Sequence, residues 1–319
     1  MRQEITPIPV RPWTLNGISE RMLVSHYENN YGGAVRTLNA VRAELAALDG
    51  TAPGYRLRAL KREELIAMNS VALHELYFGN LGGEGNKVPD DIRALLEEHF
   101  GSLPAWRREF VGTAQALAGG SGWALLTYAR RDRRLYVQSA FDHSQSAVDA
   151  APVLALDMYE HSYHLDFGAN ATAYIDAFMR NVDWAAVTER IGAVRGDRAL
   201  PSDDPSDQSL PSLSVEELAA RLAKGEPVQV LDARPRHHIS RTVDLMAGAM
   251  WRDPDRLDDW IGELSPDKPV AVYCAYGFHV GCNVTRTLRE KGFDARYVRG
   301  GISAWYAAGG ARALRPAAG

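Results

Sequence analysis

The sequence has little cysteine, no long apolar run and no large excess of charge, and each shortage excludes a class of protein. Its 319 residues contain only two cysteines, Cys274 and Cys282, both near the C-terminus, which excludes a disulfide framework. No apolar run could span a bilayer, and the opening MRQEITPIPVRPW lacks the apolar core of a signal peptide. A net charge of −4 provides no basic face of the kind nucleic acids require. We therefore expect a cytoplasmic protein that binds neither membranes nor nucleic acid.

What the chain does contain is enough material for two globular domains. Hydrophobic residues make up 46% and charged residues 24% of the sequence, as in ordinary globular proteins, and the length exceeds that of one typical domain. Residues 194–211, RGDRALPSDDPSDQSLPS, are polar, rich in Pro, Ser and Asp, and without periodicity. This composition is typical of a flexible linker. We expect one domain over residues 1–193 and a second over residues 212–312.

The first domain is predicted to be α+β, with an antiparallel helical hairpin over residues 19–80 and a mixed part over residues 90–193. Ser19 is a candidate N-cap for a helix that runs to Leu48, and after the turn TAPGYRL a second helix is expected from Lys61 to Phe78. Alternating segments joined by a charged turn predict a small antiparallel sheet. Further helices are expected near 90–100, 103–118, 171–180 and 184–191, and strands in WALLTYA, RLYVQSA and PVLALD.

The second domain is predicted to be α/β, because helices and strands alternate along it. Buried strands are expected in VQVLDARP, PVAVYC and ARYV, and helices in SVEELAARLAKG, PDRLDDWIGEL and VGCNVTRTLREKG. A strand–helix alternation of this kind favours a parallel sheet.

A candidate metal site begins with Asp157 and His161, in the run LALDMYEHSYHLDFG. If this run is helical, residues four apart share one face and can bind a single ion. His26 and His74 lie among apolar neighbours on the two helices of the hairpin and provide two further candidate ligands. The alternative for each histidine taken singly is a satisfied core or surface residue.

This arrangement resembles the iron/manganese superoxide dismutase family over roughly residues 7–192. The resemblance is carried by SERMLVSHYENNYGGAVRTLN, VALHELYF, GSGW, DMYEH and YIDAFMRNVDW. It implies that His26, His74, Asp157 and His161 hold one iron or manganese ion per subunit, and that superoxide is the substrate. It also implies a homodimer, because Glu160 in this family bridges to the last ligand of the second subunit. Three imidazoles and one carboxylate form a mixed N/O ligand set suited to either metal.

The sequence departs from this family around the expected ligands. A gateway His and Tyr are usual four and eight residues after the first ligand, and Asn30 and Ala34 occupy those positions. His164 stands where a Tyr usually reaches the gateway His across the dimer interface, so an Asn30–His164 pair is a hypothetical replacement. Tyr159 stands in place of a Trp.

The Gln that usually bonds to metal-bound solvent also lacks a clear counterpart. By register its place falls at Asp142 or His143, and the alternative site on the second helix falls near Ser70. A carboxylate would accept a hydrogen bond from bound water, whereas an amide donates one to bound hydroxide. This difference affects turnover more than metal binding.

The second domain centres on Cys274, which lies in CAYGFH between a strand and a helix. Successive backbone N–H groups and a helix N-terminus at this place are expected to lower the pKa of the thiol. The alternative is a buried, unreactive cysteine at a strand end.

The segment over residues 212–310 resembles the rhodanese family, through LDARP, AGAMWRDP, VYCAYG and VRGGISAW. The resemblance implies that Cys274 is a nucleophile that carries persulfide sulfur from a sulfane-sulfur donor to a thiol acceptor, with the backbone of residues 275–279 as its cradle. His279 stands where many members have an anion-binding Arg. Asp232 and Arg234 are expected to form a structural pair, and Cys282 is interpreted as a packed helix residue, with resolution of a persulfide as the alternative.

Two functional hypotheses follow. The first is a superoxide dismutase-like metalloenzyme fused to a rhodanese-type sulfurtransferase. The second is a metal-binding or oxyanion (chromate-type) detoxification protein without dismutase activity, in which the rhodanese module acts in sulfur relay or binding.

Overall fold

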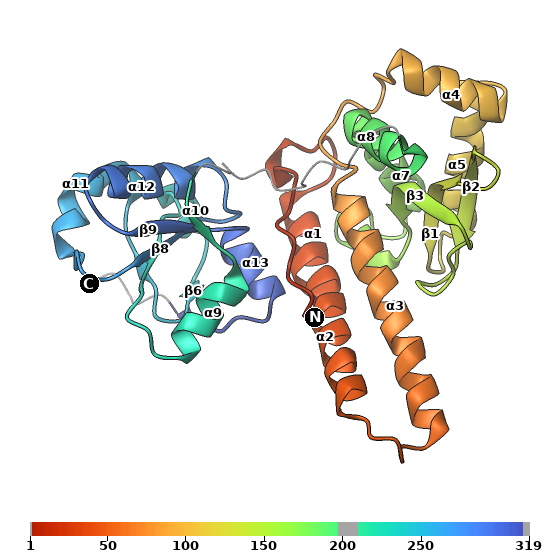
Figure 1. Ribbon diagram of the computed structural model, residues 1–319. Helices are drawn as coiled ribbons and strands as arrows, with labels where there is room; N and C mark the ends of the chain where they lie inside the picture. The colour runs from red at the N-terminus through yellow and green to blue at the C-terminus, as the bar shows by residue number, and fades with distance from the viewer. Residues whose placement is uncertain (1, 197–209, 315–319) are drawn as a thin grey trace. The chain divides into compact units, whose positions relative to one another are not determined.

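The computed structural model describes residues 2–196 and 210–314, and the chain divides into two compact units (Figure 1). One unit begins at Pro9 and contains the candidate metal ligands. The other contains the C-terminal third of the chain together with the residues that precede Pro9. The sequence placed these first residues in the N-terminal domain. Most of the expected linker, residues 197–209, lies outside the described residues.

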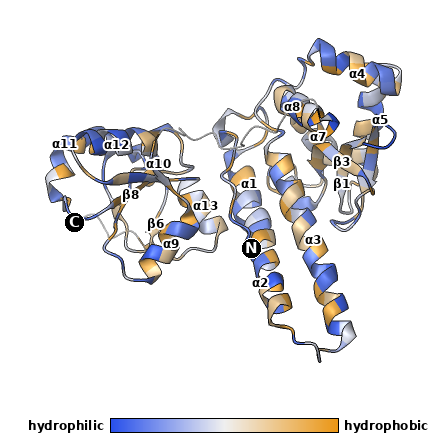
Figure 2. Cartoon of the chain, in the orientation of Figure 1, coloured by the Kyte–Doolittle hydropathy of each residue, from blue (hydrophilic) through white to orange (hydrophobic). Residues whose placement is uncertain are grey.

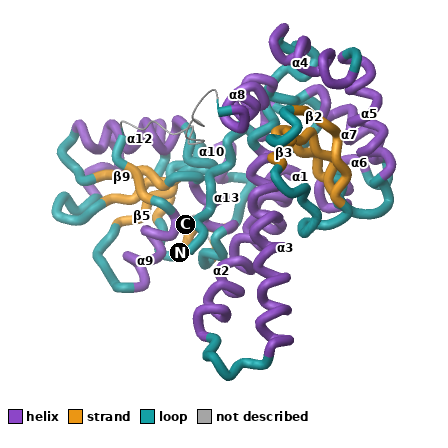
Figure 3. The backbone as a smooth tube through the Cα atoms, turned by 45° about the vertical axis from the view of Figure 1, so that its right-hand side comes forward, coloured by secondary structure: helices purple, strands orange, loops and turns teal. Residues whose placement is uncertain are grey.

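The metal-ligand unit opens with a helical hairpin (Figure 3). Ser19 caps the first helix as expected, because its side chain accepts a hydrogen bond from the Met22 N–H. That helix is not uniformly α-helical. It runs through α1 (Glu20–Ser25), a π-helical turn η2 (His26–Tyr31) and α2 (Gly32–Ala47), and the loop at 48–53 leads back into α3 (Gly54–Phe78).

The second helix of the hairpin begins seven positions before the expected Lys61, because Pro53 already occupies the N-cap position with an extended backbone. Only residues 48–53 are needed for the turn, so the rest of the predicted turn TAPGYRL is helical. In Figure 2 both hairpin helices mix hydrophobic and hydrophilic residues along their length, as expected of helices that bury only one stripe.

A three-stranded antiparallel sheet forms the rest of this unit's core, in the order β2–β1–β3. The central strand is buried on both faces except at its last residue, since α5 packs against β1 and β2 while α3 and α8 pack against β3. The strands are β1 (Trp123–Ala129), β2 (Arg134–Ala140) and β3 (Ala150–Asp157), and the helices are α4 (Asp90–Phe100), α5 (Leu103–Ala116), α6 (His164–Phe167), α7 (Ala171–Arg180) and α8 (Trp184–Arg195).

The C-terminal unit is α/β, with a five-stranded parallel sheet in the order β4–β9–β8–β5–β7. The strands are β4 (Ser212–Leu213), β5 (Gln229–Asp232), β7 (Met250–Trp251), β8 (Val270–Tyr273) and β9 (Ala295–Val298); β6 (Asp244–Met246) and β10 (Arg312–Leu314) pair separately. The helices are α9 (Val215–Ala223), α10 (Arg236–Ile239), α11 (Leu257–Trp260), α12 (His279–Glu290) and α13 (Gly301–Ala307). The predicted fold classes of both halves are confirmed.

One predicted helix of this unit is broken into shorter pieces. The segment PDRLDDWIGEL folds as a 3₁₀ turn, the single α-helical turn α11 and a second 3₁₀ turn. The backbone of Arg256 and of Trp260 leaves helical geometry before each new piece, which allows the Trp260 indole N–H to donate to the Asp253 carbonyl. Within the described ranges, no helix is both long enough and apolar enough to cross a membrane.

A buried ion pair stabilises the C-terminal unit. Asp232 and Arg234 are 0% and 2% exposed, and the Arg234 Nε and Nη2 donate to both carboxylate oxygens of Asp232 at 2.6–3.0 Å. We predict that Arg234→Ala lowers the free energy of unfolding by about 3–5 kcal/mol, because it leaves a buried carboxylate without its partner. Denaturant unfolding measures this change.

The exposed pair Lys291–Asp258 provides the control for that prediction. Its Nζ–Oδ1 distance is 2.6 Å, but the two side chains are 43% and 85% exposed. Lys291→Ala is expected to change the unfolding free energy by less than about 1 kcal/mol. Equal losses from the two substitutions would contradict a structural role for the buried pair.

Candidate functional sites

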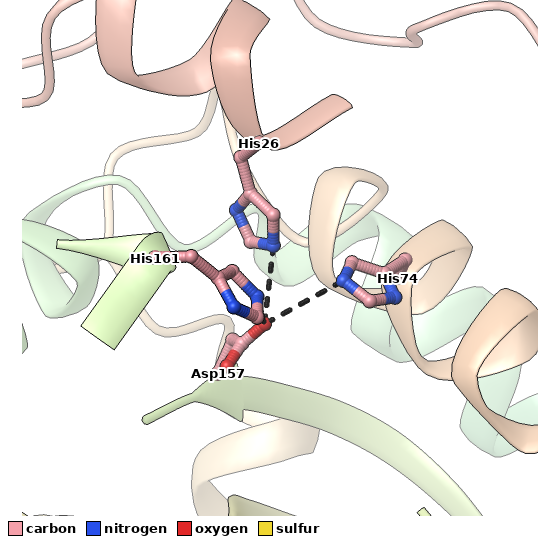
Figure 4. A group of neighbouring side chains, drawn as sticks. All are labelled: His26, His74, Asp157 and His161. Atoms are coloured by element: carbon pink, nitrogen blue, oxygen red, sulfur yellow. Dashed lines mark ion pairs between the residues drawn. The ribbon is translucent and has the colours of Figure 1, made fainter. Parts of the chain in front are cut away.

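Four side chains converge inside the first unit, and they come from three separate parts of the chain (Figure 4). His26 starts the π-helical turn, His74 lies in the last part of α3, Asp157 ends β3, and His161 lies in the 3₁₀ turn η3 (Glu160–Ser162). Their potential ligand atoms all lie within 4.8 Å of one another. The topology therefore brings together the four residues singled out from the sequence.

The three imidazoles face a single carboxylate oxygen. The Asp157 Oδ2 lies 3.1 Å from His26 Nε2, 3.3 Å from His161 Nε2 and 3.8 Å from His74 Nε2. These four atoms are buried and lack a hydrogen-bond partner. Buried polar atoms are normally satisfied, so four orphaned atoms converging on one point fit a bound cation.

The protonation states of the buried ligands suit a cation as well. Burial lowers the pKa of His26, and it lowers the pKa of His74 to about 3, so both rings stay neutral and keep a free lone pair. Burial alone would raise the pKa of Asp157, but the electrostatic attraction of the nearby His161 and His26 side chains outweighs it, and the net shift is downward. Neutral imidazoles and an ionised carboxylate are the forms that bind metals.

Neighbouring groups orient two of these side chains. The Nδ1 of His74 lies 2.7 Å from the Ser70 carbonyl oxygen, and a proton on Nδ1 donating there leaves Nε2 to face the site. The Tyr159 N–H donates to Asp157 Oδ1 at 2.8 Å, which leaves Oδ2 for the site. Ser70, an alternative place for a solvent-binding group, instead has its hydroxyl 3.3 Å from His74 Nδ1.

The helical geometry considered for the Asp157–His161 pair is wrong. Asp157 ends a strand, and His161 follows it in a 3₁₀ turn, so the two residues do not share a helix face. They meet because the chain enters a 3₁₀ turn shortly after the strand, and the Ser162 hydroxyl holds this turn by donating to the carbonyls of Asp157 and Tyr159.

The two candidates for the solvent-binding position, Asp142 and His143, lie in different environments. Asp142 accepts hydrogen bonds from the N–H and hydroxyl of Ser144, which lower its pKa and hold it in a surface turn. His143 lies beside the site, with its ring centroid 6.1 Å from that of His74 and stacked on Tyr159 at 5.0 Å. Tyr159 in turn stacks on His161 at 5.4 Å.

The hydrogen bond between Trp123 and His143 determines the imidazole tautomer. Because an indole N–H can only donate, the His143 Nδ1 that lies 2.9 Å from Trp123 Nε1 must be unprotonated. Burial lowers the pKa of His143, so its proton is carried on Nε2 in the neutral ring. The neutral ring of His143 therefore keeps an N–H on Nε2 that can donate a hydrogen bond.

The remaining candidates lie around the ligands in different environments. Asn30 is half-buried in the π-helical turn, whereas Glu160 and His164 are exposed, in η3 and at the start of α6. The expected Asn30–His164 contact is one between subunits, so it stays a prediction.

Sequence reasoning missed a link between the two hairpin helices. The Tyr31 hydroxyl donates to Glu75 Oε1 at 2.7 Å, and this bond joins the π-helical turn that carries His26 to the helix that carries His74. A 3.6-residue period cannot place Tyr31, because the π-helical turn changes the register of the helix. The sequence signal that could have indicated this bond is Glu75, an acidic residue directly after the candidate ligand His74.

The second candidate site surrounds Cys274, which follows β8 and is 5% exposed. Backbone N–H groups of Tyr276, Gly277, Phe278 and Gly281 face its sulfur. Three of these N–H groups lie within the expected cradle at residues 275–279, and the fourth, that of Gly281, belongs to α12. The expected fall in the thiol pKa is wrong, because burial raises the pKa of Cys274 more than these N–H groups lower it.

The other residues singled out around this loop have clear positions. His279 is exposed at the first position of α12. Cys282 is buried in the first turns of the same helix, with its Sγ 3.8 Å from the Gly277 carbonyl oxygen. Both cysteines are free thiols.

Comparison with known proteins agrees with both halves. A superoxide dismutase [Fe] of Cupriavidus metallidurans is 53% identical over 194 residues, which cover 60% of this chain and 98% of that protein. The chain belongs to the iron/manganese superoxide dismutase family. The model of the C-terminal domain of iron/manganese superoxide dismutases matches residues 88–190, and the rhodanese-like domain model matches residues 214–308. Both resemblances inferred from the sequence are confirmed.

More distant members of this dismutase family cover the same part of the chain. A superoxide dismutase [Fe] of Aquifex pyrophilus is 33% identical over 189 residues, 57% of this chain and 87% of that protein. A superoxide dismutase [Mn] 2 of Haloferax volcanii is 34% identical over 188 residues, 58% of this chain and 92% of that protein. The relatives thus include proteins named for each of the two metals.

Proposed function

We propose that this chain is a superoxide dismutase that uses one iron or manganese ion per subunit, fused to a sulfurtransferase domain. The observation that supports the first activity best is the convergence of three imidazole nitrogens on Asp157 Oδ2. When bound there, iron or manganese would supply one-electron redox chemistry, and two superoxide ions with two protons would yield dioxygen and hydrogen peroxide.

The protein's own groups would orient the ligands and deliver hydrogen bonds. Ser70 and the Tyr159 N–H would hold His74 and Asp157 in their binding orientations. The His143 Nε2–H would act as the donor that an amide supplies in other family members, with Trp123 fixing its tautomer. The exposed Glu160, one residue before His161, supports the proposed homodimer, because it is accessible to a second subunit.

Metal analysis and superoxide turnover of the same purified sample test the first activity. The proposal requires about one iron or manganese ion per chain and turnover that scales with occupancy when metal is removed and restored. A fully loaded protein without turnover would rule out dismutation and leave a metal-binding domain.

Substitution of His143 tests its proposed role as a donor. We predict that His143→Leu lowers dismutation roughly 10–100-fold with metal content unchanged, in line with the effect of other outer-shell substitutions. His143→Gln keeps a donor and is expected to retain more activity. If the Leu and Gln variants turn over equally, position 143 does not act through a hydrogen bond.

We also propose that Cys274 is the sulfur carrier of the rhodanese-like domain. Its thiolate would attack the sulfane sulfur of a donor such as thiosulfate, which forms a persulfide and releases sulfite. The persulfide sulfur would then pass to a thiol acceptor. The N–H groups of Tyr276, Gly277, Phe278 and Gly281 support this role, because they can stabilise the negative charge on sulfur before and after the attack.

A further inference from the structure

The N-terminal arm, defined as residues 2–8, is part of the C-terminal unit. The side chain of Ile8 is 0% exposed and that of Ile5 is 7% exposed. The Ile5 N–H donates to Glu216 Oε1 at 3.0 Å, in the first turn of α9. A segment at the start of the chain is therefore buried in the domain that lies more than two hundred residues later in the sequence.

The arm lies against the turn that supports the Cys274 loop. A Cβ on Gly300 would be 3.5 Å from Cα and Cβ of Pro7, and a Cβ on Gly277 would be 2.5 Å from the Gly300 nitrogen. The next residues of the turn bind the cysteine loop directly: the Ile302 N–H donates to the Cys274 carbonyl at 2.9 Å, and the Ser303 N–H donates to the Ala275 carbonyl at 3.1 Å. Arm, turn and cysteine loop are thus in contact in series.

We propose that the N-terminal arm is a positioning element for the Cys274 loop, acting through the turn at Gly300. Pro7 lies in van der Waals range of the Gly300 position, and Gly300 abuts Gly277, whose φ of +77° shapes the loop. The arm residues have no role in binding sulfur. They hold the backbone that presents the N–H groups to the sulfur, and this inference rests on the proposed function of Cys274.

The arm has a second consequence for the whole chain. Because Pro9 begins the metal-ligand unit, the chain passes from one unit to the other at residues 8–9 and again between residues 196 and 210. The rhodanese-like segment expressed without residues 2–8 would lack a buried part of its own unit. We therefore expect the arm to position the Cys274 loop in the full-length protein as well as in an isolated rhodanese-like domain.

Thiol alkylation of the full-length protein tests the arm. The double variant Ile5→Asp/Ile8→Asp should release the arm, and Glu4→Ala, at an exposed arm position, is the matched control. With iodoacetamide at pH 8 and mass spectrometry of the labelled peptides, we expect Cys274 to react at least about tenfold faster in the double variant, because its loop opens more readily. Cys282 is held in α12 but has its Sγ 3.8 Å from the Gly277 carbonyl oxygen, so its rate should rise clearly less than that of Cys274. The Glu4→Ala protein should match the wild type.

Two results would overturn the proposal. Unchanged Cys274 labelling in the double variant would mean that the arm does not control the loop. Equal acceleration of Cys274 and Cys282 would mean that the arm only stabilises the domain.

A peptide of residues 2–9 added to a chain lacking residues 2–8 should restore slow labelling of Cys274. Iodoacetamide needs no sulfur transfer, so labelling tests the arm even if Cys274 fails to form a persulfide.

Discussion

Asp157→Ala is expected to remove the bound metal and dismutation together. Asp157 Oδ2 is the one atom on which all three imidazole nitrogens converge, at 3.1–3.8 Å, and alanine leaves these nitrogens without an anionic partner. Loss of a ligand should exceed the roughly 10–100-fold effect typical of the groups that merely orient ligands. We therefore predict metal content below about a tenth of the wild-type value, with turnover reduced in proportion. Elemental analysis and a superoxide assay on one sample measure both.

Two companion variants separate ligand loss from damage to the fold. Asp157→Asn keeps an oxygen that can accept from the Tyr159 N–H but replaces the anionic ligand, so it should bind metal with an affinity between those of wild type and Asp157→Ala. Asp142→Ala removes a nearby aspartate that bonds only within its own turn, and it should keep full metal content. Full occupancy in Asp157→Ala would show that the ion binds elsewhere.

Sequence patterns predicted the sheet of the metal-ligand unit well. Two runs, WALLTYA and RLYVQSA, match β1 and β2 at both ends, because a charged turn separates them and their apolar residues have no helical period. The local preference of these two segments for strand structure agrees with their pairing as antiparallel neighbours in the sheet. The same agreement explains why Ser19 was found as a cap: its role depends only on residues within one helical turn.

The site's finer geometry could not be read from the sequence, because it depends on contacts between distant segments. The π-helical turn at His26–Tyr31 has no local signature, and it shifts every later residue of its helix relative to the 3.6-residue period. The sequence leaves Asp142 and His143 as equal candidates, because the bond from the Trp123 indole to His143 joins residues twenty positions apart. The helical assumption for Asp157–His161 failed because a strand end and a 3₁₀ turn also bring residues four apart together.

The unit to which residues 2–8 belong and the direction of the Cys274 pKa shift both depend on packing between distant segments. Residues 2–8 contain a single proline and show no local pattern that reveals which unit will bury them. The N–H groups around Cys274 follow from its place between a strand and a helix, but the burial that opposes them depends on packing from the rest of the unit. Sequence motifs thus identify the reactive groups, whereas their reactivity is set by long-range packing.

Cys274→Ser is expected to abolish persulfide formation and leave the metal site intact. A thiolate can take sulfane sulfur from a donor, whereas the serine hydroxyl has a similar shape but cannot form the persulfide. The measurement is cyanide-labile sulfur after incubation with thiosulfate, which should fall from about one atom per chain to background. Cys282→Ser is the matched control, since it removes the other thiol of the chain and should still load fully.

The pH dependence of loading provides an independent check on Cys274. Burial raises the thiol pKa, so the thiolate is a minor species at neutral pH, and its fraction rises about tenfold per pH unit until the pKa is reached. The initial loading rate of Cys282→Ser should therefore climb between pH 7 and pH 9, whereas a lowered pKa would give a flat profile over that range.

Cys274→Ser should retain metal content and superoxide turnover, because the four metal-site residues belong to the other compact unit. Loss of both activities from this single substitution would show that the two sites depend on each other.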